Sequence, residues 1–404
     1  MKRYIPIAVL WISCLAAQQQ QLPELDREYE RNEAYWILNQ RREAAGLNRL
    51  SKNDALQTAA QRHAAYAVRH RTSSHYEEET QAGYSGRTPF ERAVAAGYPS
   101  RLVSENLSTN NVNAEASVDG LFSAIYHRFG FLDPSIDEVG IGVAQAKGIN
   151  TFVYDMGNGN IAHLCQRPSL RISGAYVYDV CADANKRLPM EAFKKARTLN
   201  ARYNPPYILY PYAGQEEVPP VFYHESPDPL PDYEVSGFPV SILFNAYHIK
   251  HPKLLSFELY NAQGKRIACR VMDKAGDPNG RFTQYQYALF PLQRLEYDTT
   301  YEAKAVFETD GKRKNITWKF HTRKPEEPLF RIDRDKTEIA LKHVRSFWLY
   351  IVPRHGHDLL KNVVHDSALY VRFLDHNTLR VVLPKRPKRR YTIEADGRKI
   401  VIYP

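Results

Sequence analysis

The sequence has few cysteines and no long apolar run beyond its N-terminus. Its 404 residues include four cysteines, none in a Cys-x-x-Cys pair, which argues against a zinc finger, a thioredoxin-like redox site or a disulfide-dense mini-domain. A mean hydropathy of −0.52 excludes a multi-spanning membrane protein. Hydrophobic residues at 43% and charged residues at 25% are ordinary globular values, so wholesale disorder is excluded too. A chain of this length predicts two to four domains.

Basic residues are missing from one segment and concentrated in another. Residues 203–235 contain no Lys or Arg and six acids, whereas residues 330–404 contain 16 basic and eight acidic residues. The net charge of the whole chain is +10. An acidic join followed by a basic module indicates modular construction.

Most catalytic signatures are also absent. The sequence has no Gly-x-Ser-x-Gly, no P-loop, no His-Glu-x-x-His and no Rossmann glycine run. These absences remove the common serine hydrolases, nucleotide-binding enzymes and zincin proteases from consideration.

The N-terminus has the pattern of an export signal. A basic start, a short apolar stretch and small residues occupy residues 1–17, a run too short to span a bilayer. Residues 11–14 resemble a bacterial lipobox, which would place a lipid on Cys14 and, with Leu15 next, direct the protein to the outer membrane. Cleavage near Ala16 or Ala17, giving a secreted protein, stays open. Export implies an oxidising compartment, in which Cys165 and Cys181 could pair and leave Cys269 as a buried small hydrophobe.

The chain divides into helices followed by strands, an α+β pattern. Helices are expected at about residues 24–45, at 54–70 behind a capping box at Ser51–Asp54, at 89–97 behind a Thr88-Pro-x-Glu91 start, and at 113–128. Strands are expected at 139–143 and 151–154. A helix at 190–200 lies in a linker, residues 161–235, whose Pro- and Tyr-rich strap from 204 is expected to run along a surface.

The second half reads as β structure. Alternating segments such as 316–320, with turns at Asn261–Gly264 and Asp310-Gly311, predict an immunoglobulin-like sandwich over residues 236–323. Four more strand patterns predict a small basic β-rich module over residues 329–404.

Six short motifs in residues 25–160 occur in the order found in one family. They are Leu38-Asn-x-x-Arg-x-x-Ala-Gly-Leu47, Leu56-x-x-Ala-Ala60, Ser-Ser-His75, Ser104-Glu-Asn-Leu107, Tyr126-His-Arg128 and Glu138-Val-Gly-Ile-Gly-Val143. Together they resemble a bacterial-type CAP domain, of the cysteine-rich secretory, antigen 5 and pathogenesis-related-1 superfamily. The resemblance implies an α-β-α sandwich with an open cleft lined by His75, Glu105 and His127.

The cleft residues suggest metal chemistry. Two imidazoles facing one another, His75 and His127, make an open site that suits zinc, and a carboxylate such as Glu105 can fix the tautomer of a ligand. Fuller versions of the family's site carry a second Glu on the fourth helix, but residues 120–126 contain no acid. Glu91 and Glu138 are possible substitutes, although capping explains Glu91 better. Both histidines could also be ordinary structural residues.

The remaining histidines and the basic run near the C-terminus have simpler interpretations. Structural or solvent roles are expected for His63 and His70, and a turn for His355-Gly-His357. Residues 384–391 contain five basic side chains, Lys385, Arg386, Lys388, Arg389 and Arg390. These could bind lipid phosphates or acidic glycans. Alternatively, they are solvated side chains of a hairpin turn. Nucleic acid is not expected as a partner of an exported chain.

The leading hypothesis is therefore an exported envelope protein, without enzymatic activity, that binds a lipid, peptide or glycan in the cleft and docks through its β modules. One alternative is a metal-assisted hydrolase that uses the same cleft on a peptide or ester bond. The other is a purely structural envelope component.

Overall fold

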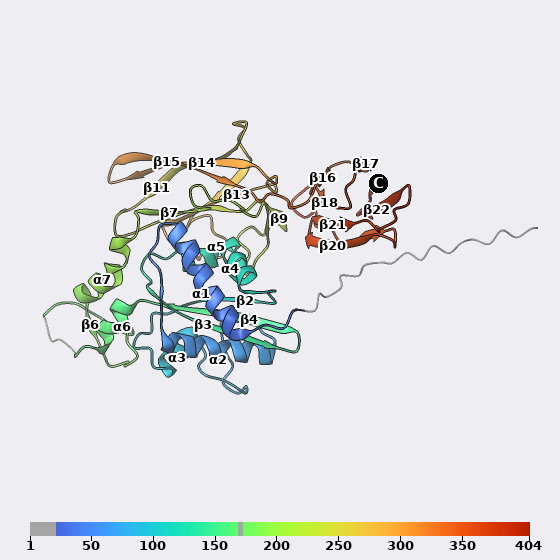
Figure 1. Ribbon diagram of the computed structural model, residues 1–404. Coiled ribbons are helices and arrows are strands. Elements are labelled where there is room, and N and C mark those ends of the chain that lie inside the picture. The colour runs from blue at the N-terminus through green and yellow to red at the C-terminus, as the bar shows by residue number, and fades with distance from the viewer. Residues whose placement is uncertain (1–21, 169–172) are drawn as a thin grey trace, which may run out of the picture.

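The computed structural model describes residues 22–168 and 173–404 (Figure 1). The expected export signal and Cys14 lie outside these described residues. In the described part of the chain, no helix is both long enough and apolar enough to cross a membrane.

The first 130 or so described residues form three layers, confirming the expected α-β-α sandwich (Figure 1). A sheet of order β1-β3-β4-β2 lies between helices α2 and α3 on one face and α1, α4 and α5 on the other. The strands are β1 (Ser51–Lys52), β2 (Ser104–Thr109), β3 (Glu138–Ala146) and β4 (Ile149–Gly157). The helices are α1 (Arg27–Ala44), α2 (Asp54–His70), α3 (Pro89–Ala95), α4 (Ala114–Ser123) and α5 (Ile125–Phe131).

Strand β3 shows how the layers fit together. Ile141 and Val143 belong to the core shared with α1 and α4. On the opposite face, a Cβ added to Gly140 would lie 1.9 Å from the backbone nitrogen of Gln57, and one added to Gly142 would lie 2.2 Å from the carbonyl of Ala60. These glycines let the backbone of α2 rest directly on the sheet.

The helix starts were only partly predicted. The capping box of α3 is confirmed, because Thr88 Oγ1 accepts the Glu91 N–H and Glu91 accepts the Thr88 N–H. The capping box at Ser51–Asp54 is wrong. Asn53 caps α2 instead, while Ser51 and Lys52 pair in parallel with β3.

The single helix expected at 113–128 is also wrong, because the chain breaks at Ala124 into α4 and α5. Two side-chain contacts explain the break, one of them from a residue distant in sequence. The Ile125 N–H donates to Glu225 Oε1 at 2.9 Å, and the Phe122 carbonyl accepts from Arg128 Nε at 2.6 Å. Side chains therefore satisfy backbone groups that a continuous helix would pair internally.

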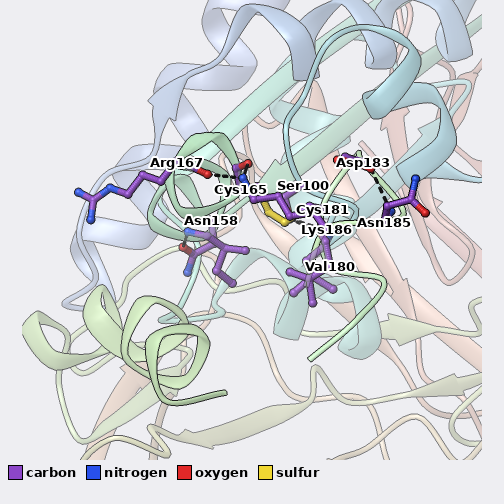
Figure 2. Close-up of a disulfide and its surroundings, with 11 residues drawn as sticks. Ser100, Asn158, Cys165, Arg167, Val180, Cys181, Asp183, Asn185 and Lys186 are labelled. Atoms are coloured by element: carbon purple, nitrogen blue, oxygen red, sulfur yellow. Dashed lines mark hydrogen bonds between the residues drawn. A yellow bond between two sulfur atoms is a disulfide. The ribbon is translucent and has the colours of Figure 1, made fainter. Parts of the chain in front are cut away.

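A disulfide joins Cys165 to Cys181, as expected (Figure 2). It ties helix α6 (Gly159–Gln166) to a segment that pairs with the first domain through Ser100, whose Oγ donates to the Val180 carbonyl. Beyond it lie β5 (Tyr176–Val177), β6 (Leu188–Pro189), the predicted helix α7 (Met190–Leu199) and the short 3-10 helix η1 (Ala201–Tyr203). Cys269 is free and only partly buried, less buried than expected.

Two sheets form the expected immunoglobulin-like sandwich, with orders β12-β13-β10-β7 and β11-β14-β15. Their inner faces share one core, in which the rings of Phe244 and Phe307 lie 4.7 Å apart. The strands are β7 (Tyr207–Tyr210), β10 (Val240–Phe244), β11 (Lys253–Asn261), β12 (Cys269–Met272), β13 (Gln286–Pro291), β14 (Thr300–Thr309) and β15 (Lys312–His321). Strand β7 lies in the segment expected to be linker, so the sandwich begins earlier than predicted. The rest of the strap contributes the pair β8 (Phe222–Tyr223) and β9 (Val235–Ser236).

The first domain and the sandwich share a single apolar core. Arg128 lies at their junction and is fully buried. Its guanidinium donates to the Pro239 carbonyl at 2.7 Å and to Ser241 Oγ at 3.1 Å, and it stacks on Tyr210 and Phe238. The sandwich is therefore fixed against the helical face that carries α5.

The last module has two four-stranded sheets and a core of its own. Their orders are β16-β18-β21-β20 and β17-β23-β22-β19. The strands are β16 (Leu329–Ile332), β17 (Lys336–Ala340), β18 (Ser346–Ile351), β19 (Val363–His365), β20 (Tyr370–Asp375), β21 (Thr378–Val382), β22 (Tyr391–Ala395) and β23 (Arg398–Tyr403). The basic run joins β21 to β22, which lie in different sheets, so it is not a hairpin turn.

Candidate functional site

The structure brings His75, Glu105 and His127 together, as the resemblance implies. His75 follows α2 in a loop, and its Nδ1 lies 2.8 Å from Glu105 Oε1. The rings of His75 and His127 face one another with centroids 6.5 Å apart and planes inclined by 28°. The side chain of His75 is 38% exposed and that of His127 is 17% exposed, so both rings can be reached from solvent.

Strand β2 and helix α5 position these groups. Successive residues of a strand point to opposite faces, so Glu105 faces α2 and α3 while Asn106 faces α5. There Asn106 Nδ2 donates to the His127 carbonyl at 2.8 Å. The strand thus supports both sides of the site.

Glu105 is buried and ion-paired. Arg92 Nη2, from α3, lies 2.6 Å from Glu105 Oε2. Burial by itself would raise the pKa of Glu105, but the hydrogen bond from His75 and the charge of Arg92 outweigh it and lower the pKa to about 2. Glu105 is therefore ionised at neutral pH and acts as the fixed acceptor for His75 Nδ1.

A second acid lies directly across the sheet. Asp155 pairs with Glu105 in the register of β2 and β4 and is fully buried. Burial, together with the negative charge of Glu105, raises the pKa of Asp155 well above its usual range. The negative charge of Glu105 therefore favours the neutral form of Asp155.

His63 lies behind the site rather than in it, in the structural role expected. Its ring is fully buried, with Nδ1 2.8 Å from Glu77 Oε1 and Nε2 3.0 Å from the Ser74 carbonyl. Both ring nitrogens thus lie beside acceptor oxygens. The ring anchors the loop that carries His75. His70 Nε2 bonds the Ala82 carbonyl.

Glu225 is the site residue that the sequence did not reveal. Its Oε2 lies 3.4 Å from His127 Nδ1, and neither atom has a hydrogen-bond partner among the described residues. Its other oxygen accepts the Ile125 N–H. Glu225 comes from the strap, 98 positions after His127, and it is one of six acids in residues 203–235, so nothing in the sequence distinguished it from the others.

The proposed substitutes for the missing helical acid are not in the site. The Glu91 side chain caps α3. Glu138 accepts from Tyr98 Oη at 2.8 Å and from Asn53 Nδ2 at 3.0 Å. Glu225, and neither Glu91 nor Glu138, is the second carboxylate beside the two histidines.

Each imidazole thus has Nδ1 beside a carboxylate. Within the described chain, no hydrogen bond engages Nε2 of either His75 or His127. Imidazole nitrogen is a ligand that zinc favours, and carboxylates at Nδ1 are its usual outer partners. Zn–N bonds of about 2.0–2.1 Å at a tetrahedral angle require ring centroids about 5 Å apart, so the rings would have to approach one another.

The other candidate metal residues do not assemble. His355 and His357 lie in an exposed turn, as expected. No group of three or more His, Cys, Asp or Glu side chains that could hold a metal ion occurs within residues 22–168 and 173–404. The two facing histidines are therefore the best donors that the described structure offers.

Comparisons with known proteins agree with this geometry. Residues 37–156 match the Cysteine-rich secretory protein family, CAP. Among curated proteins, none matches.

Several solved structures are each similar to about a third of the chain. One is an outer surface protein of Borrelia burgdorferi, with 20% identity and a TM-score of 0.30, covering 33% of this chain and 96% of that one. A second is an extracellular SCP-domain protein of Bacillus anthracis, with 16% identity and a TM-score of 0.29. A third is a cysteine-rich secretory protein of Staphylococcus aureus, with 16% identity and a TM-score of 0.25. The match covers 33% of this chain in both cases, and 44% and 40% of those proteins. Residues 37–156 of this chain are therefore a CAP domain of the cysteine-rich secretory protein family.

Proposed function

We propose that this chain is an exported protein that binds a divalent metal, with zinc the best chemical match, between His75 and His127. The bound metal would supply a Lewis-acid contact for a peptide, glycan or lipid ligand. The observation that carries the proposal is the matched pair of contacts, Glu105 to His75 and Glu225 to His127. Each contact places a carboxylate beside Nδ1 of one ring, by a hydrogen bond at His75 and by charge proximity at His127. Within the described residues, no hydrogen bond engages either Nε2 atom.

Binding is favoured over catalysis by the state of the acids. A general base works best when its pKa lies near the operating pH. Glu105, with a pKa of about 2 and an ion pair to Arg92, is a poor base. With only two histidine donors, a bound metal would keep several positions for an external ligand.

Export is supported by the Cys165–Cys181 disulfide, because such bonds persist in oxidising compartments. The basic and then apolar N-terminal residues also support export. Attachment to an outer membrane through lipid on Cys14 is part of the proposal, and a mass measurement of the mature N-terminus separates it from release by cleavage near Ala17.

A zinc titration of the purified protein by calorimetry at neutral pH tests the site. We expect one binding event, weakened at least tenfold by His75→Ala and by His127→Ala. Glu225→Gln should weaken it about tenfold, since loss of an outer partner typically costs 10–100-fold in affinity. His163→Ala, which removes an exposed histidine elsewhere, is the matched control and should change nothing.

An isotherm unchanged in His127→Ala would remove the metal site from this cleft. Cleavage of peptide or ester substrates that requires both zinc and His127 would instead favour the hydrolase alternative. Such cleavage would show that a group other than Glu105 serves as the base.

A further inference from the structure

The end of the last module farthest from the rest of the molecule carries a cluster of positive charge. Strands β18, β20 and β21 meet at one end through Ser346, Tyr370 and Val382. At the other end, Asp375 and Thr378 contact the immunoglobulin-like sandwich. We call the first end the distal pole; it comprises the loops 341–345, 366–369 and 383–390.

Two loops that are distant in sequence combine at this pole. The Leu383 N–H donates to the Arg345 carbonyl at 2.8 Å, which places the 341–345 loop beside the 383–390 loop. Together they present seven exposed cations, namely Lys342, Arg345, Lys385, Arg386, Lys388, Arg389 and Arg390. Asp366 is the acid in the third loop, and its Oδ1 lies 3.6 Å from Lys388 Nζ.

Most of these basic side chains face solvent and do not form ion pairs within the protein. In the described chain, Lys388 alone among the seven belongs to an ion pair. Side chains at the strand ends fix the loops beneath them, since Tyr391 Oη accepts the Lys388 N–H at 2.7 Å and the Tyr391 ring is buried in the module core. Of the acids near this end, Asp366 lies beside Lys388, and Glu327 is bonded to Ser346 and ion-paired with Arg380. The seven cations facing solvent therefore leave a net positive surface, which attracts a dense array of negative charges.

We propose that the distal pole docks on an anionic lipid surface, with lipid phosphates as the groups recognised. Clusters of four to eight Lys and Arg side chains bind such surfaces, each contributing about fivefold in affinity. Tyr370 at the start of β20 is 59% exposed, and an aromatic ring with a hydroxyl suits the boundary between head groups and acyl chains.

The shape of the pole favours a broad surface over a single small anion. The cations are spread over two loops at the end of a two-sheet module, and each long side chain extends from an exposed position. The docking contacts of Asp375 lie at the opposite end. A membrane that meets the pole loops would therefore leave the contacts of Asp375 undisturbed.

Vesicle co-sedimentation of the full protein tests the proposal, using phosphatidylcholine vesicles with and without phosphatidylglycerol. We expect binding only to the anionic vesicles, weakening as salt is added. The triple variant Lys385→Ala, Arg386→Ala, Arg389→Ala should bind about 100-fold more weakly, and the double variant Lys342→Ala, Arg345→Ala about 30-fold more weakly.

The matched control removes three exposed cations from the tip of the β14–β15 hairpin, Lys312, Arg313 and Lys314, and should bind within twofold of the native protein. Thermal unfolding of each variant confirms that the fold is kept. Equal binding to neutral vesicles, or unchanged binding by both pole variants, would overturn the proposal. Capture of a soluble polyanion such as polyphosphate, without vesicle binding, would reject the membrane and assign the pole to a dissolved partner.

Discussion

At the residue scale, the site depends on charges that are buried beneath it. Glu105 lies between His75 at the surface and Arg92 and Asp155 in the interior. A buried charge that loses its partner is costly, while a protonated acid next to it adds no charge. The orientation of His75 therefore depends on groups that never touch a ligand.

Two substitutions in this network should have opposite effects. Asp155→Asn keeps the shape of the side chain and removes an acid whose folded-state pKa is raised by burial and by the charge of Glu105. Such an acid stabilises the fold at low pH, and this contribution is lost as the pH rises through its folded pKa. The variant should therefore lose less stability than the native protein as the pH is raised.

Glu105→Gln is the contrasting change. The pKa of Glu105 is lowered to about 2, so its contribution is present above its unfolded pKa and is lost as the pH falls toward 2. The substitution also removes the closer of the two carboxylates beside Arg92, leaving Glu77 at 3.8 Å, and should reduce the free energy of unfolding by about 3 kcal/mol at neutral pH. Urea unfolding over a pH series measures both variants, and equal losses in the two would contradict the assigned charges.

Sequence reasoning found the cleft residues that stand in recognisable motifs, His75, Glu105 and His127. It missed Glu225 because no local pattern links an acid in a Pro-rich strap to a helix about 100 residues earlier. Asp155 was missed for a related reason, since only the register of β2 and β4 places it opposite Glu105.

At the scale of elements, helix α2 and strand β3 set the position of the site. The loop that carries His75 leaves the end of α2, and α2 rests on β3 through Gly140 and Gly142. A shift of this helix would move His75 relative to Glu105. The Gly-Ile-Gly pattern thus contributes to the site through packing alone.

Gly142→Ala should expose this dependence. Its Cβ would lie 2.2 Å from the Ala60 backbone, so α2 must move away, at a cost of about 1–3 kcal/mol in unfolding free energy. Gly120→Ala is the matched control, because nothing lies within 4 Å of its Cβ and alanine favours a helix by about 0.5–1 kcal/mol. Chemical unfolding compares them; a Gly142→Ala protein as stable as the Gly120→Ala protein would contradict the close approach.

Elements whose signals are local were predicted well. The Thr88 capping box lies within one turn, and the alternation in β15 lies within one strand. The break at Ala124 and the pairing of Ser51 with β3 were missed because partners distant in sequence decide them. Local propensity cannot show which backbone groups will form hydrogen bonds with residues distant in sequence.

At the scale of the whole molecule, the three parts are joined in different ways. The CAP domain and the sandwich share one apolar core. The last module has a separate core. Asp375 bonds Arg294, Tyr223 and Tyr297 of the neighbouring parts, and beside it the Tyr297 ring packs on Trp348 and Tyr350 in a small buried cluster. The second junction therefore combines a polar network with a small aromatic cluster and has no shared core.

Asp375→Ala should loosen the attachment of the last module while each part stays folded. Arg294 is 7% exposed and would lose its carboxylate partner, a loss of about 3–5 kcal/mol for a buried pair. We expect a larger radius of gyration in small-angle scattering and faster proteolysis near residues 324–328. Asp335→Ala, which removes an exposed ion pair with Arg354, should leave the scattering unchanged; an unaltered Asp375→Ala profile would mean that apolar contacts hold the module.

Glu225 has a practical consequence for work on this protein. It reaches His127 from outside residues 37–156, and the strap that carries it is held by the sandwich, where β7 pairs with β10. A fragment cut at the family boundary would keep both imidazoles but lose one of their two carboxylates, together with the apolar cover of α4 and α5. Affinities or activities measured on such an excised domain would describe a different ligand set, so comparisons with free-standing relatives should use a fragment that extends at least through the end of β15.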